Sequence, residues 1–187
     1  MKQLMIICCV AFSITVCAQT KIPTLDKSPM DMSYYPANYP LLKIQDNTSE
    51  PLVARVIYSR PQKNGRVIFG ELLEYGKVWR LGANEATEIE FFQNVKINDV
   101  KIKKGRYTLY TIPTAGKWTI IVNKENDIWG SFRYDEKKDV VRVDVPVQNL
   151  GEPAESFFIL FDKINATSFN LIAGWDNAKV VLPISLN

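Results

Sequence analysis

The sequence predicts an all-β protein in which residues 51–187 form an antiparallel β-sandwich. Three observations predict this class: apolar and polar residues alternate in short runs, turn-forming residues separate these runs at close spacing, and no long stretch has a helical period. About ten short strands are expected, which suits one domain of this length. A closed barrel is the alternative, because periodicity does not decide whether two sheets face each other or one sheet closes.

Residues 1–18 have the pattern of a secretory signal peptide. Lys2 precedes an apolar run over residues 4–16, and Ala18 is the small residue before the expected cleavage point. The run is too short to cross a hydrocarbon layer of about 30 Å as a helix. We therefore expect a periplasmic or extracellular protein with no integral membrane segment after signal removal. Lipid attachment at Cys17 is the less favoured alternative, because the bulky valine before it fits such a site poorly.

Composition excludes several kinds of chemistry. The three cysteines all lie within residues 1–18, and the chain contains no histidine. Catalytic triads that use histidine, and zinc sites built from histidine or thiolate, are therefore excluded. We predict no metal site and no cofactor. The formal net charge of +3 also gives no electrostatic reason to expect a nucleic-acid partner.

Residues 19–50 are expected to form an N-terminal arm ahead of the β domain. Four prolines among Asp, Ser and Asn, with little apolar periodicity, predict an extended linker. The second half contains Tyr34, Tyr35 and Tyr39 and is more apolar than a free tether. That half either lies along the surface of the domain or adds an edge strand.

Within the domain, each predicted strand is an apolar or alternating run that ends at a proline, a glycine or a polar turn. In chain order these runs cover residues 52–58, 67–69, 77–81, 87–92, 95–97, 100–102, 106–112, 117–122, 139–145, 157–161, 169–173 and 179–184. The alternation is clear where Ile89 and Phe91 share one face, and where Val141, Val143 and Val145 do the same. These faces are expected to meet in the core.

Two pairs of neighbouring strands are predicted to be antiparallel. The runs over residues 95–97 and 100–102 are separated only by Asn98 and Asp99, whose side chains tolerate the positive φ of a two-residue hairpin turn. The runs before and after the turn at Gly116 are expected to pair in the same way.

The corner from Arg80 to Thr87 is the best candidate site. A strand-like run breaks at Gly82 and resumes at Thr87, which leaves Arg80, Asn84 and Glu85 around the corner. An arginine, an amide and a carboxylate supply more hydrogen-bonding groups than a solvated loop needs. We expect Glu85 to be the charged acceptor of this corner and Arg80 its nearest donor.

Arg60, Arg66 and Arg80 can form a basic pocket for a carboxylate or phosphate group. Guanidinium groups bind such groups through two parallel hydrogen bonds and keep their charge when partly buried. The alternative is a set of internal braces, because buried charges are normally paired. The acidic partners for such braces are Glu85, Glu71 and Asp135.

Aromatic surface is the other candidate binding feature. Trp129 precedes Gly130 in a polar stretch and is the tryptophan that we expect to be exposed, where its face can meet a sugar ring. Trp118 alternates with Ile120 and Val122, so the period of two predicts that it is buried. The predicted ligand-binding residues are therefore Arg60, Arg66, Arg80, Asn84, Glu85 and Trp129.

Three functions remain open. They are a non-catalytic binding module for a small or saccharide ligand, which we prefer, a structural or interaction domain of the envelope, and a carboxylate-dependent hydrolase. The hydrolase would use Glu85 with Glu71 or Asp135, one protonated and one ionised. An open cleft with Arg80 and Trp129 favours binding, a buried Arg80–Glu85 pair favours structure, and two carboxyl groups that flank a groove favour hydrolysis.

Several short motifs are spread over residues 51–187. They are Tyr58-Ser-Arg-Pro61, Gly65-Arg-Val-Ile-Phe-Gly70, Tyr75-Gly-Lys-Val-Trp-Arg80, Gly82-Ala-Asn-Glu-Ala-Thr87, Ile112-Pro113, Trp118-Thr119 and Trp129-Gly130. Together they resemble the bacterial domain of unknown function 2911 family, and the string from Tyr75 to Thr87 is long enough to be specific. The resemblance implies a bacterial envelope protein that is mostly β and has no assigned activity.

Overall fold

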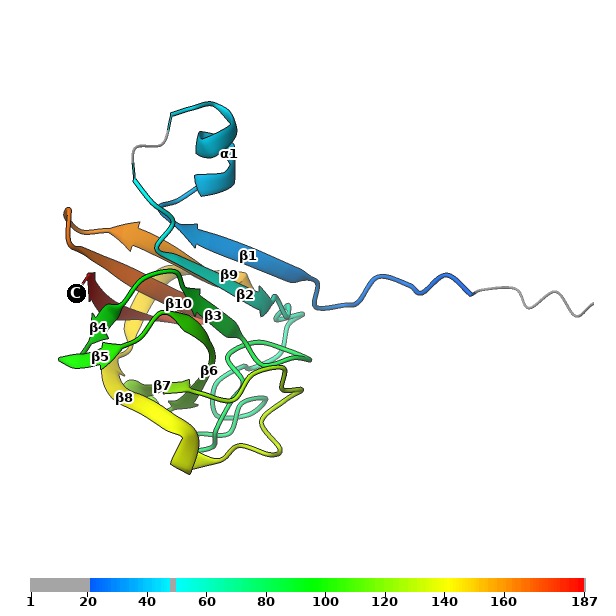
Figure 1. Cartoon of the computed structure of the whole chain (residues 1–187). Coiled ribbons are helices and arrows are strands. Elements are labelled where there is room, and N and C mark those ends of the chain that lie inside the picture. Colours follow the sequence, from blue (N-terminus) through cyan, green and yellow to red (C-terminus); the bar gives the residue numbers. More distant parts are fainter. Residues whose placement is uncertain (1–20, 48–49, 187) are drawn as a thin grey trace, which may run out of the picture.

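The computed structural model of the chain describes residues 21–47 and 50–186, which form two antiparallel β-sheets packed face to face (Figure 1). The predicted β-sandwich is thereby confirmed, and the two sheets do not join into one closed sheet. The predicted signal peptide, residues 1–18, lies outside the described residues. No helix in the described part of the chain is long and apolar enough to cross a membrane.

The first sheet has six strands and the second has four. The first sheet has the order β1 (Met30–Tyr35), β2 (Ala54–Ser59), β3 (Glu88–Phe91), β6 (Gly105–Pro113), β7 (Lys117–Asn123) and β8 (Asp139–Pro146). The second has the order β5 (Val100–Ile102), β4 (Val95–Ile97), β10 (Ser168–Leu186) and β9 (Gln148–Lys163). The helical segments among the described residues are short: the α-helix α1 (Tyr39–Ile44) and the 3-10 helix η1 (Glu136–Lys138).

Alternation along the strands places the core between the sheets. In β3, Ile89 and Phe91 are buried as predicted, while the glutamates beside them are half-buried. An aromatic cluster fills part of this core: the ring of Trp118 lies 5.9 Å from that of Trp79, which lies 6.1 Å from that of Trp175. Trp118 is buried, as its spacing predicted. Burial of rings of this size is a large stabilising contribution.

Both predicted antiparallel pairs are confirmed. β4 pairs with β5 through the residues that flank Asn98 and Asp99, whose φ angles of 46° and 64° suit a two-residue hairpin turn. β6 pairs with β7 across the turn at Gly116. Turn chemistry therefore helps to set the register of these strands.

Two of the predicted strands are wrong. Residues 67–69 and 77–81 belong to an irregular loop and contribute only to isolated bridges, such as the one between Trp79 and Thr111. Positive φ angles in this loop, for example at Leu81, interrupt the extended conformation. Tertiary contacts therefore fix the positions of the apolar residues in both runs, and continuous hydrogen bonding to a neighbouring strand does not.

The C-terminal part of the chain forms one strand where two were predicted. The runs over residues 169–173 and 179–184 are joined in β10, which pairs with β9 on both sides of register shifts near Asp176. Gly174 occupies the irregular region, and a Cβ there would lie 2.6 Å from the ring of Phe158. The glycine therefore marks a bulge with close packing, and not the end of a strand.

The N-terminal arm adds an edge strand to the first sheet. β1 pairs with β2 along its whole length. The ring of Tyr35 stacks on that of Phe169 with centroids 4.0 Å apart, and Asp31 forms an ion pair with Arg60 at 3.0 Å. Tyr34 and Tyr35 are the last two residues of this edge strand, and Tyr39 begins α1.

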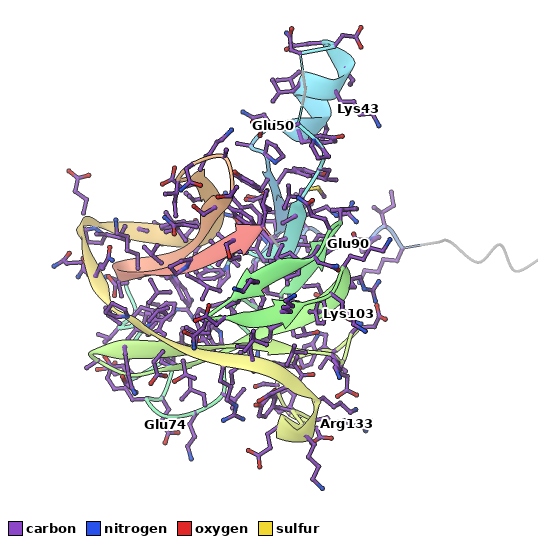
Figure 2. All side chains as sticks on the ribbon, turned by 60° about the vertical axis from the view of Figure 1, so that its left-hand side comes forward. Lys43, Glu50, Glu74, Glu90, Lys103 and Arg133 are labelled. Carbon is purple, nitrogen blue, oxygen red and sulfur yellow. The ribbon has the colours of Figure 1, made fainter. Side chains whose placement is uncertain are left out.

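Two long loops, residues 60–87 and 124–138, lie side by side at the end of the sandwich that is remote from α1 (Figure 1). In Figure 2 the labelled side chains of Glu74 and Arg133 lie at this end, and Lys43 of α1 lies at the opposite end. Backbone hydrogen bonds join the two loops. This end of the molecule therefore carries the predicted corner and also Trp129.

Candidate functional site

Buried side chains hold the corner between Trp79 and Thr87 in an uncommon backbone conformation. Leu81 and Asn84 have φ angles of 52° and 57°, a region that costs a residue such as leucine about 1–2 kcal/mol. The buried Thr87 hydroxyl donates to Leu81 O at 2.6 Å. The indole of Trp79 donates through Nε1 to Gly82 O at 2.9 Å. The corner is therefore a rigid, defined turn, and its role as a binding site stays a prediction.

A cleft of about 350 Å³ opens beside this corner, and we call it the Arg80 cleft. Of the residues predicted to bind ligand, Arg66, Arg80 and Asn84 line it. Trp79 and Trp175 form an apolar part of the wall of this cleft. None of the described residues that line the cleft is acidic. Its size suits a small molecule, since ligand pockets typically measure about 300–1,000 Å³.

The guanidinium group of Arg80 has no acidic partner among the described residues. Its Nε atom is buried and makes no hydrogen bond, and its Cζ lies 5.9 Å from the ring centroid of Trp129. Burial lowers the pKa of Arg80, because desolvation disfavours the charged form, yet an arginine stays protonated at neutral pH. A cation that is desolvated but unpaired is well placed to receive an anion.

The other two predicted arginines are held differently. Arg66 lines the Arg80 cleft, and its guanidinium donates to the backbone carbonyl of Lys63 at 2.9 Å and to that of Gln62. These bonds orient the side chain without neutralising it, so Arg66 adds a second positive charge to the cleft. Arg60 does not line the cleft, and its charge is paired with Asp31 of β1.

Glu85 lies outside the Arg80 cleft. It is exposed, and it lines a separate hollow of about 200 Å³ together with Glu88 and Asp127. Its expected ion pair with Arg80 is not formed. Both carboxyl oxygens of Glu88 are engaged, one by Asp127 N–H at 2.7 Å and one by Arg106 at 3.3 Å. Asp127 is also paired with Arg106, at 2.6 Å. Among the described residues that line this hollow, both carboxylates other than that of Glu85 are therefore already paired.

The other acidic residues considered for a pair, Glu71 and Asp135, line neither the Arg80 cleft nor the hollow at Glu85. Glu71 is exposed, and the carboxylate of Asp135 accepts a hydrogen bond from Lys137 N–H at the start of η1. Glycoside hydrolysis needs two carboxyl groups that flank one groove. The described hollows do not place Glu85 opposite either predicted partner.

The loop of residues 124–138 brings an exposed aromatic pair to the corner. Trp129 is 60 % exposed, as predicted, and Phe132 is 79 % exposed. Their ring planes are inclined by only 17°, with centroids 5.9 Å apart. Phe132 was not predicted. Its signal in the sequence is its place three residues after Trp129 in a polar stretch, where no strand period buries it.

Comparison with known proteins confirms the family resemblance. The family described as protein of unknown function (DUF2911) matches residues 41–184, which is most of the chain and includes the corner and both exposed aromatic residues. The chain has no match among the curated proteins or the solved structures with which it was compared. The family match therefore supplies a class of protein but no activity.

Proposed function

We propose that this chain, which belongs to the DUF2911 family, is a non-catalytic binding module for a small ligand that carries a carboxylate or phosphate group. The Arg80 cleft is the proposed site. Arg80 is the main receptor of the anion, Arg66 contributes a second positive charge, and Asn84 contributes a neutral hydrogen-bonding group. The indoles of Trp79 and Trp175 would cover the apolar part of the ligand.

The observation that carries the proposal is the unpaired charge of Arg80. Desolvation of that guanidinium is unfavourable for the fold, and no described acidic residue compensates it. Asp176, which follows the cleft residue Trp175, is already paired with Lys63 at 2.6 Å. A bound carboxylate or phosphate would accept two charge-assisted hydrogen bonds from Arg80 and supply the missing negative charge.

The two other functions receive less support from the contacts at the corner. A structural corner was expected to contain a closed Arg80–Glu85 pair, and a hydrolase was expected to have two carboxyl groups across a groove. The Arg80 cleft instead combines positive charge with aromatic wall, which favours an anionic organic ligand.

We also propose that the protein is exported, on the basis of the signal-peptide pattern in residues 1–18. An exported binding module would meet acidic sugars and phosphorylated compounds of the envelope or the surroundings.

A titration followed by tryptophan emission tests the proposed site, because Trp79 and Trp175 line the cleft and Trp129 contacts Arg80. We expect a saturable change with galacturonate or with inorganic phosphate, and none with galactose, which lacks the carboxylate. The affinity for the anion should fall as ionic strength rises, because salt screens a partly exposed charge pair. Equal responses to galacturonate and galactose, or no response to either anion, would contradict the proposal.

A further inference from the structure

Trp129 and Phe132, which we call the aromatic platform, present two large rings to solvent. Neither residue belongs to the buried core clusters or to the partly buried residues packed against them. Single exposed apolar side chains are common, but a stacked pair of aromatic residues is a larger apolar surface. Binding of another molecule over such a surface is favourable, because it removes apolar area from water.

The loop holds the aromatic platform in a fixed position. Gly130 has a φ of 75°, and a Cβ there would lie 2.7 Å from the ring of Phe132, so both the backbone and the packing require glycine. Gly130 N–H donates to Asn84 O at 2.9 Å, and Ser131 Oγ donates to Val78 O at 3.1 Å. These bonds tie the platform to the loop that contains the corner. The platform is therefore preorganised, which lowers the entropic cost of binding.

The aromatic platform is adjacent to the Arg80 cleft. Arg80 Cζ lies 5.9 Å from the ring centroid of Trp129. A further hollow, of about 220 Å³, shares Arg80 and Trp79 with the cleft and extends to Ser131, between the two platform residues in the sequence. Arg80 thus lies between the cleft and the platform. A ligand longer than one ring can contact both.

We infer that the ligand is an acidic oligosaccharide, in which one unit places its carboxylate at Arg80 and the neighbouring unit stacks on Trp129 and Phe132. This inference rests on the proposed function, because it takes Arg80 as the receptor of the anion. The C–H groups of a sugar ring can pack on an aromatic face while the hydroxyl groups remain in water. A uronic acid unit also carries its carboxylate directly on the ring, so charge and apolar face occur in one repeating chain.

A protein partner fits this surface less well. A standard protein interface buries about 800 Å² on each partner around an apolar centre. The aromatic platform consists of two side chains, and the nearby Asp127 and Arg133 are exposed and charged. A surface of this size, next to a small cleft with an unpaired cation, matches one or two sugar rings.

The inference is tested by the affinities of galacturonate, trigalacturonate and the neutral trisaccharide maltotriose for the wild-type protein and for Phe132→Ala. Phe132 is 79 % exposed and lies outside the buried core clusters, so we expect its truncation to leave the fold intact. Trigalacturonate is expected to bind up to about tenfold more tightly than galacturonate, a gain typical of one aromatic stacking contact. Phe132→Ala should remove that gain and leave the affinity for galacturonate unchanged. Maltotriose should bind much more weakly than trigalacturonate.

Phe92→Ala is the matched control. Phe92 is also an exposed phenylalanine beside an arginine, since Arg55 Cζ lies 5.7 Å from its ring centroid. Arg55, however, is paired with Glu90 at 2.6 Å. The Phe92→Ala variant is expected to bind trigalacturonate as the wild type does.

Each other result is informative. Equal affinities for galacturonate and trigalacturonate, or a trisaccharide advantage that survives Phe132→Ala, overturn the inference and leave the proposed function standing. Failure of both acidic saccharides to bind overturns the inference, and failure of inorganic phosphate to bind as well overturns the proposed function. If Phe132→Ala changes only self-association in sedimentation experiments, the platform is a protein contact and the inference is overturned.

Discussion

Replacement of Arg80 by methionine is expected to weaken anion binding strongly without destabilising the fold. The affinity for galacturonate should fall by about 100-fold, because an arginine fork makes two charge-assisted hydrogen bonds that together contribute about 3 kcal/mol. The free energy of unfolding should stay the same or rise, because no ion pair among the described residues is broken and a desolvated charge is removed. Methionine removes the guanidinium and its contact with the ring of Trp129 but keeps an unbranched apolar side chain.

Arg55→Met is the matched control for this variant. Arg55 also has a buried Nε without a hydrogen bond and also lies beside an aromatic ring, that of Phe92. Its charge is paired with Glu90, so the variant should lose about 1 kcal/mol of stability and retain the affinity for galacturonate. Tryptophan emission and urea unfolding measure the two quantities on each variant. A strongly destabilised Arg80→Met protein with unchanged affinity would assign Arg80 a structural role.

Asp139→Ala is expected to cause a larger loss of stability than the arginine variants. The carboxylate of Asp139 is 9 % exposed and accepts hydrogen bonds from Asn123 Nδ2 at 2.7 Å, Tyr134 Oη at 2.6 Å and Arg142 Nε at 2.6 Å. Burial and the bond to Asp139 raise the pKa of Tyr134, so its hydroxyl is a neutral donor that needs this acceptor. Removal of the carboxylate should lower the free energy of unfolding by about 3 kcal/mol or more.

Asp144→Ala provides the comparison for this loss. Asp144 lies on the same strand as Asp139, but its carboxylate is half-exposed and pairs with Lys117 at 2.5 Å and with Thr119 Oγ1 at 2.6 Å. An exposed pair of this kind contributes about 1 kcal/mol or less. Urea unfolding of the two variants should therefore give clearly different midpoints. Similar midpoints would show that the buried carboxylate of Asp139 contributes no more than an exposed one.

The Asp139 network also bears on the proposed site. Asn123 ends the strand before the loop that carries Trp129 and Phe132, Tyr134 lies within that loop, and both donate to the carboxylate of Asp139. Loss of that carboxylate removes two of the side-chain hydrogen bonds that hold the loop. We therefore expect Asp139→Ala to weaken trigalacturonate binding more than galacturonate binding.

Much of the sandwich was predictable because local signals agree with the tertiary structure. Ile89 and Phe91 alternate with polar neighbours and bury one face of β3, and Asn98 and Asp99 have the chemistry that their turn requires. The loop of residues 60–87 was not predictable in the same way. Its apolar runs look like strands, but its path depends on a positive φ at Leu81 and on a hydrogen bond from the distant Ser131 side chain to Val78 O, which no short-range pattern indicates.

The candidate site was predictable only in part. Arg80 and Asn84 share the cleft because they flank one corner. Glu85, the next residue, lies outside the cleft, because the left-handed conformation of Asn84 turns the chain away from it. Glu85 lines another hollow instead. Arg60 is paired with Asp31, which precedes it by 29 residues, and this pair forms only when the arm docks as β1. Contacts of that kind depend on the assembled sheet and not on the spacing of the residues.

In the proposed site, the guanidinium group of Arg80 receives the anion of the ligand. A ¹H–¹⁵N spectrum of the arginine Nε–H groups, recorded during a titration with galacturonate and assigned with Arg80→Met and Arg55→Met, tests this role at the group itself. The resonance of Arg80 is expected to move and to saturate with the same dissociation constant as the tryptophan emission, while that of Arg55 stays in place. An Arg80 resonance that remains unchanged at saturating galacturonate would contradict the account.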